Sequence, residues 1–166
     1  MGGRALGLPL WHPAALVATS FGAGLLPIAP GSWASLAALP VAWAIVCLWG
    51  VLGLASVAGI AFALGWWAAA AVAKASSIED PRAIVIDEIA GQWLVLVPAP
   101  LDPLAYTIGF LLFRLFDIWK PWPVRWADRH VKGGLGIMLD DLLAAVYAVL
   151  VLSVLLAIGG VSGVRS

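Results

Sequence analysis

Residues 113–141 read FRLFDIWKPWPVRWADRHVKGGLGIMLDD, and nine of the 18 charged residues of the chain lie in this stretch. The rest of the 166-residue sequence is strongly apolar, since 63% of all residues are hydrophobic and only 11% are charged. Soluble domains carry about 25% charged residues and about 45–50% apolar residues. The composition therefore predicts an integral membrane protein whose chemistry is concentrated in residues 113–141.

Three apolar segments outside this stretch have about the ~20 residues that a membrane-spanning helix needs. They comprise residues 33–52, 54–73 and 142–161. A short link through Gly50 and Gly53 joins the first two segments, which predicts an antiparallel hairpin. Alanine and glycine are frequent in both, as expected where helices approach closely in lipid. The length favours a single domain over residues 1–166.

Residues 84–119 predict a shorter helical hairpin with a proline-rich turn at residues 98–103. The apolar residues between Glu88 and Pro98 extend for about 14 Å as a helix, which is too short to cross a bilayer. The returning helix carries Arg114 and Asp117 and is expected to end before Pro121. The predicted fold class is all-α: an integral membrane multi-helix bundle with about three full spans and this hairpin.

The basic residues predict the orientation of the chain in the membrane. Seven of the nine Lys and Arg residues lie in residues 74–82 and 114–132, so the positive-inside rule places both segments on the cytoplasmic side. The same orientation brings a proline-glycine-serine turn at residues 30–32 to the side that holds the acidic residues. A net charge of zero and the lack of a basic stripe argue against a nucleic-acid partner. The oligomeric state stays open.

Two adjacent acidic pairs, Asp87–Glu88 and Asp140–Asp141, each precede a hydrophobic helix. One interpretation is that they are first-turn residues, whose carboxylates favour the positive end of the helix dipole. That interpretation leaves unexplained why both pairs face apolar surroundings, where unpaired charge is costly. A divalent cation would neutralise them, and oxygen ligands without a His or Cys cluster suit Mg²⁺ better than Zn²⁺. We therefore predict a Mg²⁺ site formed by these four residues.

A predicted phosphate site lies beside the predicted metal site. Arg114 and Asp117 are three residues apart on a predicted helix and share one face, so an internal ion pair is one interpretation. In the alternative, Asp117 reaches the metal while Arg114 and Lys120 hold a phosphate group. Arg125 is a further candidate, although an arginine at a membrane interface commonly meets anionic lipid headgroups.

Four segments of the chain resemble, in order and spacing, the signature blocks of the phosphatidylglycerophosphatase A family. They are GAGLLPIAPGS (residues 22–32), IVIDEIAGQW (residues 84–93), FRLFDIWKPWPVRW (residues 113–126) and GGLGIMLDDLLAA (residues 133–145). Members of that family are Mg²⁺-dependent membrane phosphatases that convert phosphatidylglycerophosphate to phosphatidylglycerol. The resemblance implies a phospholipid substrate and a multi-pass protein of the cell inner membrane, with its active site facing the cytoplasm.

The resemblance also adds roles to the residues identified above. Ser32, where the family pattern has Thr, is expected to donate a hydrogen bond to the phosphate, together with Arg114, Lys120 and Arg125. The expected catalytic residues are Asp117, Arg114 and Lys120. The metal is expected to polarise the terminal phosphate and to activate a water for in-line attack. Whether water or a side chain attacks phosphorus first stays open.

Two other functions compete with this one. A membrane phosphotransferase that joins a CDP-linked lipid to an alcohol also uses Mg²⁺ and clustered aspartates. Its D-G-x-x-A-R…G-x-x-x-D-x-x-x-D pattern is absent, because Leu-Leu-Ala-Ala follows Asp140–Asp141. A small non-enzymatic membrane protein or ion carrier would place its acidic groups along spanning helices at mid-bilayer depth. Here the acidic residues are predicted to gather at one boundary of the membrane.

Overall fold

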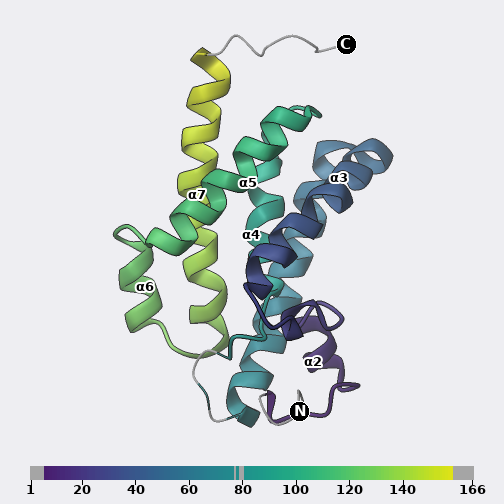
Figure 1. The fold of residues 1–166 in the computed structure, drawn as a ribbon, viewed down its shortest axis with the longest axis vertical. Coiled ribbons are helices and arrows are strands. Elements are labelled where there is room, and N and C mark those ends of the chain that lie inside the picture. The colour runs from purple at the N-terminus through teal and green to yellow at the C-terminus, as the bar shows by residue number, and fades with distance from the viewer. Residues whose placement is uncertain (1–5, 77, 79–80, 159–166) are drawn as a thin grey trace.

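The computed structural model describes residues 6–76, 78 and 81–158, which form helices joined by short connections (Figure 1). The helices are α2 (Pro13–Ala18), the short 3₁₀ helix η1 (Ala23–Leu25), α3 (Pro30–Ser76), α4 (Ile86–Leu96), α5 (Pro103–Trp119), α6 (Val124–His130) and α7 (Gly133–Ile158). No strand occurs within these described ranges. The predicted all-α fold class is therefore confirmed.

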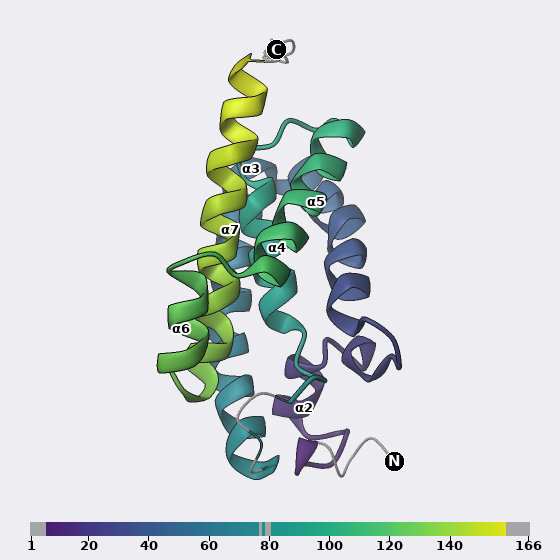
Figure 2. The same cartoon turned by 60° about the vertical axis from the view of Figure 1, so that its left-hand side comes forward.

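Helix α3 is broken at Gly50, whose φ of 69° and ψ of −174° are not helical. Glycine enters this positive-φ region without the steric cost that other residues meet. The two limbs of α3, residues 30–49 and 51–76, run in opposite directions from the turn (Figures 1 and 2). They form the hairpin predicted for residues 33–52 and 54–73. The first limb begins earlier than predicted because Pro30 starts the helix, a position that proline favours.

Helices α4 and α5 form the second predicted hairpin. The Asp102 side chain caps α5 by accepting a hydrogen bond from the Ala105 N–H at 2.8 Å, and Pro103 occupies the first turn. Helix α4 lies between α3 and α7 and packs against both. Its first turn contains Asp87 and Glu88, as the helix-terminus interpretation expected for this pair.

Helix α7 differs from the third predicted span, residues 142–161, because it already begins at Gly133. Asp140 and Asp141 are therefore inside the helix, and the helix-terminus interpretation is wrong for this pair. The glycine-rich residues 133–136 open the helix because Gly134 lies against the α3 backbone at Trp66 and Ala70. This tertiary contact outweighs the low helix propensity of glycine. Residues 159–161 of the predicted span lie outside the described residues.

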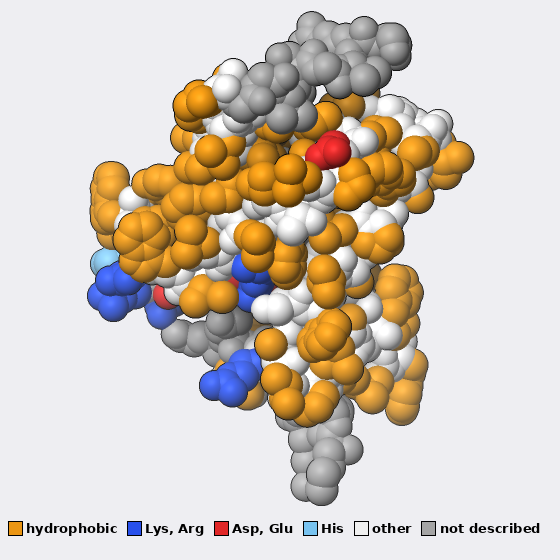
Figure 3. Space-filling view, turned by 45° about the horizontal axis from the view of Figure 1, so that its top comes forward, with side chains coloured by type: hydrophobic (Ala, Val, Ile, Leu, Met, Phe, Trp, Pro, Cys, Tyr) orange, Lys and Arg blue, Asp and Glu red, His pale blue; other side chains and the backbone are white. Residues whose placement is uncertain are grey.

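The exposed surface of the bundle is apolar. Helices α3 and α7 are long and apolar enough to cross a membrane, and only 22% and 28% of their most apolar windows are buried. A core helix of a soluble protein would be mostly buried, so these helices indicate a membrane protein. Figure 3 shows one face covered mainly by hydrophobic side chains, with a few Lys and Arg side chains between its left margin and its middle. The number of full spans remains a prediction.

Candidate metal and phosphate site

A cavity of about 380 Å³ opens where α3, α4, α5 and α7 meet. Its lining contains all the predicted site residues except Arg125, namely Ser32, Asp87, Glu88, Arg114, Asp117, Lys120, Asp140 and Asp141. These residues come from four stretches that are far apart in the sequence. The fold therefore brings the predicted metal ligands and the predicted phosphate-binding residues into one cavity.

Three carboxylates form a compact cluster in this cavity. One oxygen each from Asp87, Glu88 and Asp141 lie within 4.8 Å of one another. Asp87 and Asp141 are only 9% and 4% exposed, and burial raises the pKa of the Asp87 and Glu88 carboxyl groups. One carboxylate oxygen of each of the three residues is buried without a hydrogen-bond partner. Burying carboxylate oxygens without a partner is costly. A hard cation bound to these oxygens would remove that cost, and carboxylate oxygens are the ligands that such a cation prefers.

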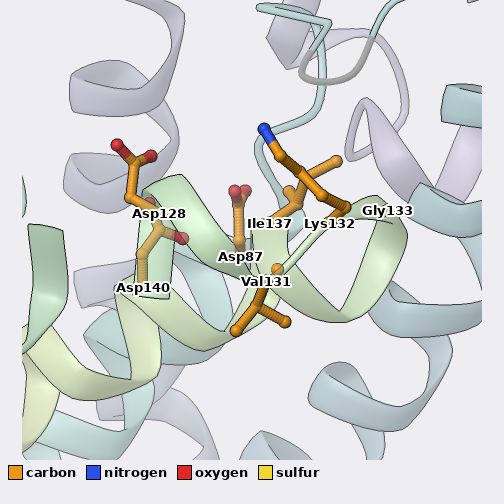
Figure 4. Close-up of a pocket in the computed structure, with 8 residues that line it drawn as sticks. Asp87, Asp128, Val131, Lys132, Gly133, Ile137 and Asp140 are labelled. Atoms are coloured by element: carbon orange, nitrogen blue, oxygen red, sulfur yellow. The ribbon is translucent and has the colours of Figure 1, made fainter. Parts of the chain in front are cut away.

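Asp140, the fourth predicted metal ligand, makes a different contact. The Lys120 ammonium forms salt bridges both with Asp140 and with Asp128 of α6, the latter at 2.7 Å between Nζ and Oδ1. Figure 4 shows the Asp87, Asp128 and Asp140 side chains around a smaller hollow of about 80 Å³ between α6 and α7. Side chains of neighbouring residues on a helix point about 100° apart. Asp140 therefore contacts Lys120, whereas Asp141 belongs to the carboxylate cluster.

Arg114 lies beside the carboxylate cluster and is paired. Its Nη1 atom is 2.7 Å from Oδ2 of Asp117 and 3.9 Å from Oε1 of Glu88. The internal ion pair, which was one of the two interpretations of the spacing along α5, is thus present, and both of its members line the cavity. The Nε atom of Arg114 is buried without a partner. A guanidinium with an unused donor beside a cavity is suited to bind an anion.

Lys120 ends α5 in the left-handed conformation, with φ 47° and ψ 65°. This conformation is uncommon for a residue other than glycine. Burial alone would lower the pKa of Lys120, but the charges of Asp140 and Asp128 outweigh that effect and raise it. Lys120 therefore carries its positive charge at the edge of the cavity.

The remaining predicted residues lie at different distances from the cluster. Ser32, in the first turn of α3, lines the cavity. Arg125 does not: its side chain is exposed and donates a hydrogen bond to the Trp119 carbonyl oxygen at 3.1 Å. Two further residues were not predicted from the sequence: Arg82, which lines the cavity, and Asp128, which forms a salt bridge with Lys120. Arg82 precedes Asp87 by a few residues in a polar loop on the predicted cytoplasmic side, and this signal could have identified it.

A family model described as phosphatidylglycerophosphatase A matches residues 16–156. The chain belongs to this family. The resemblance seen in the four sequence blocks is therefore confirmed, and membership of the phosphatidylglycerophosphatase A family makes the chain a phosphatase. The match includes every residue that lines the cavity.

Individual relatives agree with the family assignment. The chain is 42% identical over 138 residues to "Phosphatidylglycerophosphatase A" of Escherichia coli (82% of this chain, 77% of the relative). It is 38% identical over 145 residues to the protein of the same name from Haemophilus influenzae (87% and 89%). It is also 36% identical over 149 residues to a "Putative phosphatidylinositol-3-phosphatase" of Bacteroides thetaiotaomicron (84% and 91%). No solved structure matches the chain.

Proposed function

We propose that the chain hydrolyses the terminal phosphate of phosphatidylglycerophosphate to give phosphatidylglycerol, by Mg²⁺-assisted phosphoryl transfer to water. One observation carries this proposal: a single cavity joins the carboxylate cluster of Asp87, Glu88 and Asp141 to the cations Arg114 and Lys120. Such a cavity offers anionic ligands for a cation next to cationic donors for a phosphate. Two relatives named phosphatidylglycerophosphatase A support this choice of substrate.

The donor set of the cavity fits Mg²⁺. Asp87, Glu88 and Asp141 would hold the ion through oxygens that have no partner within the described protein, with Asp140 beside them. No His or Cys side chain is among the described residues that line the cavity, which favours a hard cation. When bound, Mg²⁺ would neutralise phosphate charge and lower the pKa of a bound water.

The side chains of the chain would bind and orient the phosphate. Arg114 and Lys120 would donate hydrogen bonds to its non-bridging oxygens, and Ser32 would add a hydroxyl donor. Asp117, through its 2.7 Å contact with Nη1, holds the Arg114 guanidinium toward the cavity. In the reaction, a water oxygen bonds to phosphorus and the bond from phosphorus to the glycerol oxygen breaks. That oxygen is then protonated, so the products are phosphatidylglycerol and inorganic phosphate.

The lipid nature of the substrate agrees with where the cavity lies. We propose that it lies at the cytoplasmic face of the inner membrane, because the end of α3, the start of α4 and helix α6 lie toward the same end of the bundle (Figure 1), and the basic residues of the chain are concentrated next to these elements. A phospholipid lying in that leaflet would present its phosphate to the cavity without leaving the bilayer.

Phosphate release by the purified full chain in lipid–detergent micelles tests the proposal. We expect release from phosphatidylglycerophosphate that stops with EDTA and returns when Mg²⁺ is added. Phosphatidylinositol 3-phosphate is the comparison substrate, because one relative is named for that activity. Phosphate release from phosphatidylinositol 3-phosphate but not from phosphatidylglycerophosphate would show that the proposed substrate is wrong. Formation of CMP from a CDP-linked lipid and an alcohol, without phosphate release, would instead favour the phosphotransferase.

A further inference from the structure

A second hollow, of about 210 Å³, lies between the second limb of α3, α4 and α7. Its walls include Ala55, Gly59 and Phe62 of α3, Leu94 of α4 and Leu142 of α7. All of the described residues that line it are apolar or glycine except Asp87. Asp87 and Leu94 are seven residues apart on α4, so the hollow follows that helix for about 10 Å. We call it the apolar groove.

The apolar groove meets the phosphate cavity at one residue. Asp87 lines the groove, the cavity of about 380 Å³ and the smaller hollow beside α6. Its Oδ1 atom is buried without a hydrogen-bond partner. The apolar groove therefore borders the carboxylate cluster, beside which the proposed site holds the phosphate.

We propose that the apolar groove binds an acyl chain of the phospholipid substrate, with Asp87 at the boundary between its headgroup and its tail. This inference rests on the proposed function. A phospholipid matches the two neighbouring hollows, because its charged phosphate suits the charged cavity and its apolar acyl chain suits the apolar groove. The groove also opens toward the bilayer, because Gly59 is exposed and a Cβ atom there would have no neighbour within 4 Å.

A second copy of the chain is the competing occupant. Ala55 and Gly59 are four residues apart, which is a common spacing of small residues where membrane helices associate. Such an association would not require a charged residue at the end of the groove. The position of Asp87 in the walls of both the groove and the phosphate cavity therefore favours the acyl chain.

The groove is expected to align the substrate more than to increase its affinity. An acyl chain that leaves the bilayer for the groove exchanges one apolar environment for another, so little transfer free energy is gained. A chain held along α4 does fix the distance between the glycerol phosphate and the carboxylate cluster. A displacement of about 1 Å at a reacting group can reduce the rate about 100-fold. Loss of the groove should therefore appear mainly in kcat.

Gly59→Leu tests the inference, because Gly59 lines the groove and a Cβ atom there has no neighbour within 4 Å. We therefore expect the leucine to be accommodated and to occupy the groove. We expect kcat for long-chain phosphatidylglycerophosphate to fall at least tenfold. Activity on the same compound without its acyl chains should change less than twofold. Ala63→Leu is the matched control, since Ala63 is exposed on the same limb of α3 and does not line the groove. It should leave both activities unchanged.

A cross-linking experiment gives a readout that does not depend on turnover. Phosphatidylglycerophosphate with a diazirine in mid-chain should label Phe62 and Leu94 in the unmodified protein. Labelling should fall at least fivefold in Gly59→Leu and stay constant in Ala63→Leu. Ala55→Leu fills the groove one turn away and replaces Gly59→Leu if that variant does not accumulate in membranes.

The possible results separate the two proposals. No phosphate release by the unmodified protein would overturn the proposed function. Normal release together with equal activity of Gly59→Leu and the unmodified protein on long chains would overturn only the groove inference. Labelling spread evenly over the lipid-exposed helices would also overturn the inference. Disulfide formation between two copies of a Cys47→Ser/Ala55→Cys variant under oxidising conditions would overturn the inference and assign the groove to a dimer contact.

Discussion

Gly31 of α3 lies directly against the carboxylate of Glu88 on α4, so closely that a Cβ atom at position 31 would overlap Oε1 of Glu88. Both residues are in the first turns of their helices. The absence of a side chain at position 31 therefore lets α3 approach α4 at the carboxylate cluster. Gly31 determines where Glu88 can lie without being a ligand itself.

Gly31→Ala should displace the Glu88 carboxylate while the protein stays folded. The atom that the new methyl group meets is the end of a flexible side chain, so Glu88 can move more easily than a helix backbone. Groups that orient metal ligands typically contribute about 10- to 100-fold in metal affinity or activity. We expect a loss of that size in phosphate release, partly restored by a higher Mg²⁺ concentration. The loss is checked by titrating Mg²⁺ in the phosphate-release assay.

The matched control for Gly31→Ala is Leu36→Ala in the same limb of α3. Leu36 is 43% exposed and does not line the cavity, so activity should remain close to that of the unmodified protein. Full activity of Gly31→Ala at low Mg²⁺ would show that the position of Glu88 is not important for the site.

The helices could be predicted largely from the distribution of apolar residues, proline and glycine. The break at Gly50 falls where the sequence predicted a link between two apolar segments. The start of α7 could not be predicted, because residues 133–136 are glycine-rich and locally favour a turn. They are helical because Gly134 allows α7 to touch the backbone of α3, a contact that no local pattern shows.

Part of the candidate site could be predicted because charged residues are rare in this chain. Asp87, Glu88 and Asp141 stand out among apolar neighbours, and the structure brings them together. Asp128 could not be identified in the same way, because it is one of several charged residues in the polar stretch before α7. Its contact with Lys120 joins the end of α5 to α6 across the turn between these helices. In a stretch with many charged residues, the sequence does not show which of them belong to the site, because this depends on the residues that they contact in the fold.

Asp141→Asn should abolish phosphate release while the protein remains folded. Asp141 is 4% exposed and belongs to the three-carboxylate cluster. The amide has nearly the same shape as the carboxylate but carries no negative charge for a cation. We expect activity to fall at least about 100-fold, together with loss of the rise in Tm that ligand binding to the folded state produces on addition of Mg²⁺. Activity retained at saturating Mg²⁺ would remove Asp141 from the site.

Lys120→Met and Asp128→Asn should differ strongly in their effects on kcat. Lys120 is expected to donate to the phosphate, and loss of one such donor commonly costs about 100- to 1,000-fold. The Asp128 side chain is 37% exposed and contacts Lys120 but does not line the phosphate cavity. Partly exposed ion pairs contribute about 0–1 kcal/mol, so Asp128→Asn should cost no more than about fivefold. Steady-state kinetics of both variants test this, and equal losses would contradict the assignment of Lys120 as the phosphate donor.

Gly134→Ala should destabilise the fold, unlike Gly31→Ala. A Cβ atom at position 134 would overlap the α3 backbone at Ala70 and Trp66. Unlike the end of a flexible side chain, a helix backbone cannot move away without a shift of the whole helix. Overpacking of this kind typically costs about 1–3 kcal/mol, so Tm in detergent should fall. Leu135→Ala is the control, because Leu135 is 37% exposed at the next position and exposed substitutions usually change stability by less than about 0.5 kcal/mol. An unchanged Tm for Gly134→Ala would mean that α3 and α7 can separate here without cost.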